Sequence, residues 1–185
     1  MIQDYINCLK GCLEELSNQN IEEIADIIVG AWKKKKHVFI MGNGGSATTA
    51  SHFARDLQVG TAVKGKPRVQ AIGLTDNVAL ITALANDIDY SSVFEEQLIG
   101  QMGVGDVVIG ISASGNSPNV LKAIEYAREN GGITIGFVGF GGGKLKNLVD
   151  KSIVLSQKGY RQVEDTHLCL SHMVTELVAE KLANA

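Results

Sequence analysis

The sequence has no apolar run that approaches the ~20 residues a transmembrane helix needs, and its first residues lack the charged and apolar regions of a signal peptide. With 17 basic against 20 acidic side chains, its net charge of −3 gives no electrostatic case for binding nucleic acid. Cysteine is scarce as well. Cys8, Cys12 and Cys169 are an odd number, and we interpret them as reduced packing residues rather than as metal or redox groups. These absences predict a cytoplasmic protein with no nucleic-acid or membrane partner.

What is present suits one globular domain over residues 1–185, since 45% of the residues are hydrophobic and no repeat, linker or low-complexity stretch interrupts them. Residues 1–35 read as two amphipathic helices with a break near residues 17–20. The lysine run that follows, residues 33–36, invites a nucleic-acid interpretation. Its place at the end of a helix favours a solvated cap that interacts with the helix dipole.

Short apolar runs alternate with helical patterns along the rest of the chain. We predict strands at residues 38–41, 69–74, 107–111, 133–138 and 153–155, and helices near residues 77–85, 92–101, 118–130, 145–148 and 162–182. This alternation predicts an α/β fold, with a doubly wound five-stranded parallel sheet covered by helices on both faces. Ligands of such sheets bind beyond the carboxyl ends of the strands, so the loops there are the place to look for chemistry.

The first of these loops is the glycine loop, residues 42–46 (GNGGS), which lies between an apolar strand and a helix. Backbone N–H groups at such a turn point toward an anion, and the helix N-terminus adds roughly half a positive charge. The run also matches the dinucleotide-binding pattern G-x-G-x-x-A. That pattern wants an acid at the end of the second strand, and the first one here, Asp76, comes too late. A Walker A loop fails too, because Leu145 follows Gly143-Lys144.

The second is the serine loop, residues 112–117 (SASGNS), which precedes Pro118. Ser117 is suited to the N-cap position and Pro118 to the first position of a helix. A capped polar turn would explain part of this sequence. Three serines in six positions exceed what capping needs, so we predict a phosphate site.

Two helices carry the metal-binding residue types. His52 and Asp56 are one turn apart, and could be half of a metal site, an acid–base pair or a surface pair. Glu164 and His172 lie in the last helix, within an otherwise apolar pattern, and with the first two they make a plausible zinc ligand set. One difficulty is that Glu164 and His172 are eight residues apart, roughly 12 Å along a regular helix.

Taken together, the glycine loop, the HFA after it, the Asn86-Asp87 pair, the serine loop and the terminal E-x-x-H-x-x-x-x-H resemble the sugar-isomerase (SIS) domain. Within it, they resemble the sedoheptulose 7-phosphate isomerase family. The resemblance covers nearly the whole chain. It implies a flavodoxin-like fold, a cytoplasmic homotetramer assembled through residues 1–35, sites between subunits, and a sugar-phosphate substrate for bacterial heptose biosynthesis.

Position by position, the resemblance implies roles for these residues. The implied substrate contacts are Asn43, Gly44, Gly45, Asn86, Asp87, Ser112, Ala113, Ser114, Ser117 and Glu164; the implied metal ligands are His52, Asp56, Glu164 and His172. Three positions depart from the family, which has Thr at Ala113, Glu at Asp56 and Gln at Glu164.

As a mechanism we predict Asp56 and His172 as the acid–base pair of an aldose–ketose isomerisation, with a divalent cation, zinc by its ligand types, polarising the carbonyl. Two alternatives stay open. Some relatives are not enzymes but bind the bacterial replication initiator; those look degraded at the terminal-helix histidine, whereas His172 is present here. The chain could also be an isomerase or sensor for another sugar phosphate.

Overall fold

The computed structural model describes residues 1–157 and 159–185. Its centre is one sheet of five parallel strands in the order β2-β1-β3-β4-β5. The strands are β1 (His37–Gly42), β2 (Gln70–Gly73), β3 (Val107–Ser112), β4 (Ile133–Val138) and β5 (Lys151–Val154). This confirms the predicted α/β fold. β5 begins two residues earlier than predicted, because Lys151 pairs with Ile135 in the parallel register with β4.

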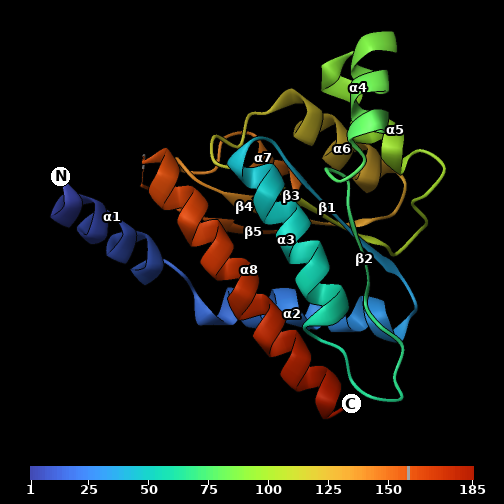
Figure 1. Ribbon diagram of the computed structural model, residues 1–185, viewed down its shortest axis with the longest axis horizontal. Helices are drawn as coiled ribbons and strands as arrows, with labels where there is room; N and C mark the ends of the chain where they lie inside the picture. Colours follow the sequence, from blue (N-terminus) through green and yellow to red (C-terminus); the bar gives the residue numbers. More distant parts are fainter. Residues whose placement is uncertain (158) are drawn as a thin grey trace.

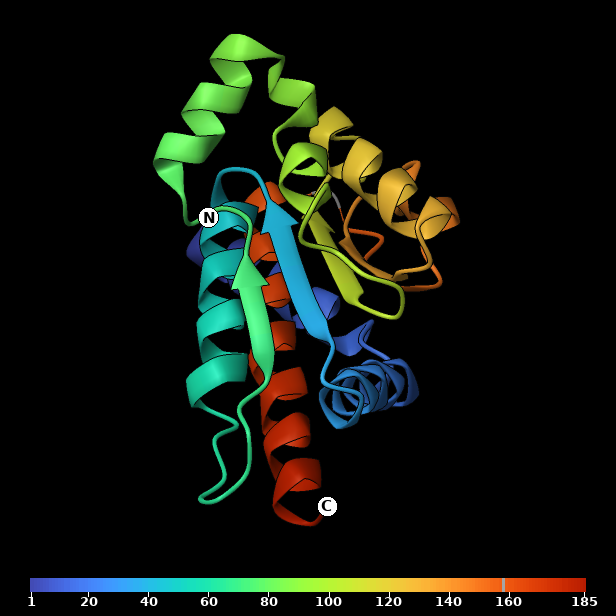
Figure 2. The same cartoon turned by 90° about the vertical axis from the view of Figure 1, so that its right-hand side faces the viewer.

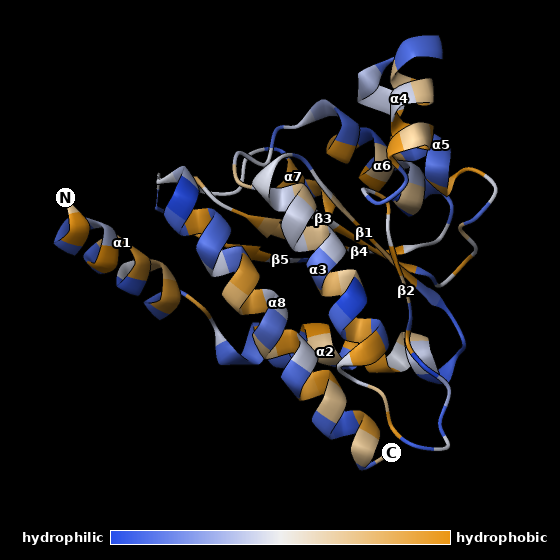
Figure 3. Ribbon diagram, viewed as in Figure 1, coloured by the Kyte–Doolittle hydropathy of each residue, from blue (hydrophilic) through white to orange (hydrophobic). Residues whose placement is uncertain are grey.

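Strand side chains alternate between two hydrophobic cores, as a sheet covered on both faces requires. Val38 and Ile40 of β1 belong to one core, and Phe39 and Met41 to the other. The strands accordingly appear as the apolar centre of the molecule in Figure 3. No described helix is long and apolar enough to cross a membrane.

Three long helices cover the first face: α2 (Asn18–Lys33), α3 (Gly45–Val59) and α8 (Tyr160–Ala183). α3 and α8 lie side by side in front of the sheet (Figure 1). The second face is covered by α5 (Glu95–Leu98), α6 (Pro118–Glu129) and α7 (Leu145–Leu148).

The single helix predicted over residues 92–101 is wrong. The segment forms a 3-10 turn, η1 (Tyr90–Ser92), and the four-residue α5, because Val93 and Phe94 between them are both buried in the second core.

Two helices project from this body in Figure 1, and the second of them also does so in Figure 2. α1 (Ile2–Glu14) packs against α8 and leaves Ile2 79% and Ile6 40% exposed. α4 (Val78–Asp87) reads VALITALAND and still has no buried residue in this chain. Ile81, Leu84 and Ala85 of α4 are partly buried against the second core, whereas Val78 is 67% exposed.

The connections fix where a ligand can bind. β1 leads through α3 to β2 on one side, whereas β3 leads through α6 to β4 on the other, so the strand order reverses between β1 and β3. The glycine loop follows β1 and the serine loop follows β3. Both loops therefore lie at the point of the sheet where doubly wound folds bind their ligands.

Candidate functional site

The serine loop forms one wall of a pocket of about 200 Å³, which we call the serine pocket. Its lining residues are Asn43, Ser46, Ile111, Ser112, Ala113, Ser114, Ser117, Tyr160 and Glu164. Ser117 is the N-cap of α6 and Pro118 its first residue, as predicted. Ser117 does not cap with its side chain; its Oγ lies 3.1 Å from Ser112 Oγ instead. The hydroxyls and the start of α6 thus face the same small space, a suitable environment for an anion.

Glycine lets the serine loop pack on its neighbour, the segment 139–143 that follows β4. Gly115 has φ +63°, and a Cβ there would lie 2.2 Å from the carbonyl oxygen of Gly142. Leu145 N–H donates to the Gly115 carbonyl at 3.0 Å, and Lys144 N–H donates to Asn116 Oδ1 at 3.2 Å. The serine loop is held from behind by backbone contacts that no larger residue at position 115 would allow.

An amide network links the glycine loop to the second face. Asn43 and Asn119 exchange two side-chain hydrogen bonds of 2.9 Å, and Tyr90 Oη donates to Asn43 Oδ1 at 2.9 Å. Asn119 is 2% exposed. Asn43 is thereby fixed in the serine pocket wall, while Gly44 takes φ +55° as the N-cap of α3. The sequence contained no signal for Tyr90 or Asn119, since the first is 47 residues away and the second 76.

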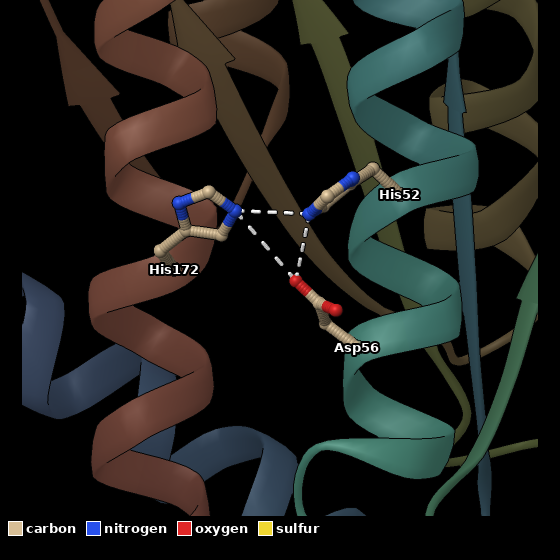
Figure 4. Close-up of side chains that lie close together, drawn as sticks. All are labelled: His52, Asp56 and His172. Carbon is tan, nitrogen blue, oxygen red and sulfur yellow. Dashed lines mark hydrogen bonds and ion pairs between the residues drawn. The ribbon is translucent and has the colours of Figure 1, made fainter.

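The structure brings together His52 and Asp56 of α3 and His172 of α8 (Figure 4). His172 Nε2 lies 2.9 Å from His52 Nε2, and Asp56 Oδ2 lies 3.0 Å from His52 Nε2 and 3.7 Å from His172 Nε2. We call these three residues the His–Asp cluster. Asp56 is largely covered, at 13% exposure, whereas the histidines are 38% and 50% exposed. A pocket of about 170 Å³ opens beside Asp56 and His172.

The donor set of this cluster fits a divalent cation. Two imidazole nitrogens and one carboxylate oxygen lie within 4.8 Å of one another. All three are side-chain atoms. Two histidines and a carboxylate with an open fourth position are the ligand pattern of catalytic zinc sites. Zinc or a similar ion would be held by these three side chains.

Glu164 is not part of the His–Asp cluster. It lies two turns earlier on α8, where its carboxylate fills the space above Gly45: a Cβ at Gly45 would lie 2.5 Å from Glu164 Oε2. The carboxylate stands at the positive N-terminus of α3, which is a favourable place for it. The eight-residue spacing therefore separates the two side chains. α8 is a regular helix, and it places Glu164 at the serine pocket and His172 at the His–Asp cluster.

Asn86 and Asp87 lie at the end of α4, exposed and away from both pockets of this chain. Asn86 Nδ2 donates to Asp87 Oδ1 at 2.8 Å. Neither residue lines the serine pocket or the pocket beside the cluster.

The remaining polar residue of the terminal motif, His167, faces the sheet and is 1% exposed. Its ring lies 6.3 Å from that of Phe137, and among the described residues neither ring nitrogen has a hydrogen-bond partner of ordinary geometry. Burial lowers the pKa of His167 from 6.5 to about 4, against an opposing effect of the Val138 backbone. His167 is a neutral core residue rather than a ligand of the cluster.

Arg55 is the group at this site that the sequence analysis missed, although it is adjacent to Asp56. Its Nη2 lies 2.9 Å from Asp56 Oδ1 and 3.5 Å from His52 Nε2. A cation therefore lies beside the cluster, with 59% of its side chain exposed to solvent.

Comparisons with known proteins agree with the fold of this chain. Residues 3–139 match the family model described as SIS domain. A phosphoheptose isomerase of Thermodesulfovibrio yellowstonii is 41% identical over 88% of this chain and 80% of its own length. Solved phosphoheptose isomerases of Francisella tularensis and Neisseria gonorrhoeae are each 26% identical and superpose with TM-scores of 0.90 and 0.88. Each superposition covers 97% of this chain, and 96% and 95% of the other chains respectively.

Proposed function

The chain belongs to the phosphoheptose isomerase family of SIS-domain proteins, and from that premise we propose that it interconverts sedoheptulose 7-phosphate and D-glycero-D-manno-heptose 7-phosphate. The observation that carries the proposal is the shared position of two sites along α3 and α8. The serine pocket includes Ser46, at the start of α3, and the His–Asp cluster begins six residues later. At 1.5 Å per residue the two are about 9 Å apart along the helix.

This spacing suits an extended sugar phosphate, with its phosphate in the serine pocket and its reacting carbons at the cluster. Ser112, Ser114 and Ser117 would bind the phosphate oxygens together with the α6 N-terminus. Ala113 offers no hydroxyl, so one contact that the family makes is absent. Binding energy from the phosphate would orient the distant carbons for reaction.

Asp56 and His172 would move the protons. Aldose–ketose isomerisation transfers a proton between adjacent carbons and needs a second group to serve the carbonyl oxygen. Asp56 Oδ2 and His172 Nε2 are 3.7 Å apart, so both can reach two neighbouring atoms of one substrate. His52 Nε2 lies within 3.0 Å of both and would hold them in place. These proton-transfer roles belong to the cluster without an ion. A divalent ion, zinc by the donor set, would be held by the same side chains of His52, Asp56 and His172 and would polarise the carbonyl instead.

The proposal includes a homotetramer with sites shared between subunits, in which α1 takes part in assembly. Two features support it. The apolar helix α4 has no fully buried residue, and Asn86 and Asp87 at its C-terminal end do not line the pockets of their own chain. α4 would bring Asn86 and Asp87 to a neighbour's serine pocket. Sedimentation velocity that finds only monomers at micromolar concentration would contradict this part.

Substitution of the acid–base pair tests the activity itself. We expect Asp56→Asn and His172→Asn each to lower kcat by about 10²–10⁴, the usual contribution of one acid–base group, with the assembly unchanged. NMR of heptulose phosphate conversion measures it. Glu125→Gln, an exposed acid on α6 far from both pockets, is the matched control and should keep full activity. Near-wild-type turnover in either cluster variant would refute the assignment. Wild-type protein that converts no heptulose phosphate but captures initiator protein would favour the non-catalytic alternative.

A further inference from the structure

The guanidinium of Arg55 shares the carboxylate of Asp56 with the two histidines. It lies 2.9 Å from Oδ1, while Oδ2 is the oxygen that faces His52 and His172. The same Nη2 is 3.5 Å from His52 Nε2. Two of the three donors that would hold a metal ion are thus already next to a permanent positive charge, because arginine does not lose its proton in proteins.

Two opposite effects on a bound ion follow from this contact. A hydrogen bond to the outer oxygen of a ligand carboxylate fixes its orientation, which favours metal binding. A positive charge beside the ligands repels a divalent cation, which disfavours it. The hydrogen bond from Arg55 adds little to the orientation of the Asp56 carboxylate. Asp56 is only 13% exposed and lies one helical turn from His52 on the same helix, so its side chain is already held in place. The charge effect should therefore dominate.

We propose that Arg55 is a resident cation that weakens divalent-metal binding at the His–Asp cluster, so that the cluster holds its ion loosely and exchanges it. The proposal rests on the metal site of the proposed function, but not on turnover of any particular sugar. Without an ion, the guanidinium compensates the charge of Asp56. With an ion bound, Arg55 can turn toward solvent, to which 59% of its side chain is already exposed.

The size of the effect follows from Coulomb's law. Unit charges a few ångströms apart in water interact by about 1 kcal/mol, which is about fivefold in a binding constant, and a divalent ion doubles that energy. Screening by dissolved salt offsets part of the gain. We expect neutralising Arg55 to tighten zinc binding about tenfold.

The test is a zinc titration of the full-length, metal-free protein against a chromophoric chelator, with no substrate present. Arg55→Gln should bind zinc about tenfold more tightly than wild type, and Arg55→Lys, which keeps the charge, should stay within threefold of wild type. The difference between Arg55→Gln and wild type should narrow at high salt. Arg128→Gln removes an exposed arginine at the end of α6, on the other face of the sheet, and should change nothing. His172→Gln should weaken binding in every background, which locates the measured ion at the cluster.

Unchanged or weaker zinc binding by Arg55→Gln would overturn the proposal, since Arg55 would then have no effect or would orient Asp56. Equal tightening by Arg55→Lys would overturn it too, because the geometry of the contact and not the charge would be responsible. So would the absence of zinc binding in all variants. A wild-type protein that binds zinc in this pattern but converts no heptulose phosphate would refute the proposed function alone.

Discussion

His167 should make the folded protein sensitive to mild acid. Its imidazole is 1% exposed and held neutral in the core beside Phe137, and burial lowers its pKa from 6.5 to about 4. When the chain unfolds, the imidazole is exposed to water and takes up a proton at its ordinary pKa. The unfolded state therefore binds more protons than the folded state between pH 6.5 and pH 4. The stability that neutral His167 contributes is complete above pH 6.5 and is lost as the pH falls toward 4.

The magnitude comes from the two pKa values. A shift of 2.5 units, from 6.5 to about 4, corresponds to about 3 kcal/mol of unfolding free energy over the whole window. Between pH 7 and pH 5 the loss from this one residue is about 2 kcal/mol, since the folded state hardly protonates there. This is a large part of the 5–15 kcal/mol that holds a typical domain folded.

Replacing His167 by a residue that does not titrate separates its contribution to the pH dependence of the unfolding free energy from the contributions of the other histidines and the carboxylates. His167→Leu removes no hydrogen bond of ordinary geometry, because neither ring nitrogen has such a partner among the described residues and the Val138 backbone interacts only weakly with the ring. Urea unfolding of both proteins at pH 7, 6 and 5, at one fixed protomer concentration, should show wild type losing about 2 kcal/mol more than His167→Leu. His167→Gln serves as a second, polar variant and should behave like His167→Leu. Parallel losses in wild type and both variants would refute the claim that His167 is neutral in the fold.

Two further changes probe the serine pocket. Glu164→Gln removes a negative charge from a pocket that we expect to bind phosphate. Calorimetry should therefore show that inorganic phosphate binds the variant about fivefold more tightly than wild type. Weaker binding would show that the carboxylate of Glu164 favours phosphate binding. Tyr90→Phe removes the hydrogen bond to Asn43 but leaves the Asn43–Asn119 pair. KM should therefore rise about three- to tenfold, with kcat within twofold of wild type. A fall in kcat alone would contradict a positioning role for Tyr90.

Much of the fold could be predicted from the sequence because a parallel sheet buried on both faces leaves continuous apolar runs. β1 and β4 are read directly from such runs. The segment with η1 and α5 could not be predicted, since its helical pattern is broken by the need to bury Val93 and Phe94 side by side.

For the site, the sequence indicated which residue types are present but only partly which of them lie together in space. The one-turn spacing of His52 and Asp56 places both on one face of α3. Their contact with His172, 120 residues away from His52 in the sequence, depends on how α3 packs against α8. The separation of Glu164 from His172 follows from helix geometry alone. His167 shows the limit of such reasoning: it belongs to the same polar motif as His172, and only the packing of α8 on the sheet shows that it faces the core.

The close contact of Gly115 with Gly142 has a consequence for how a ligand binds. The backbone of the serine loop packs directly on the backbone of residues 142–143, and Leu145 N–H donates to the Gly115 carbonyl, so the loop is already in place without a ligand. The entropy of ordering that loop is then lost during folding rather than at the moment of binding. If the proposed phosphate site is correct, the phosphate end would be bound by a preorganised loop, and adaptation to a particular sugar would depend on groups on other segments.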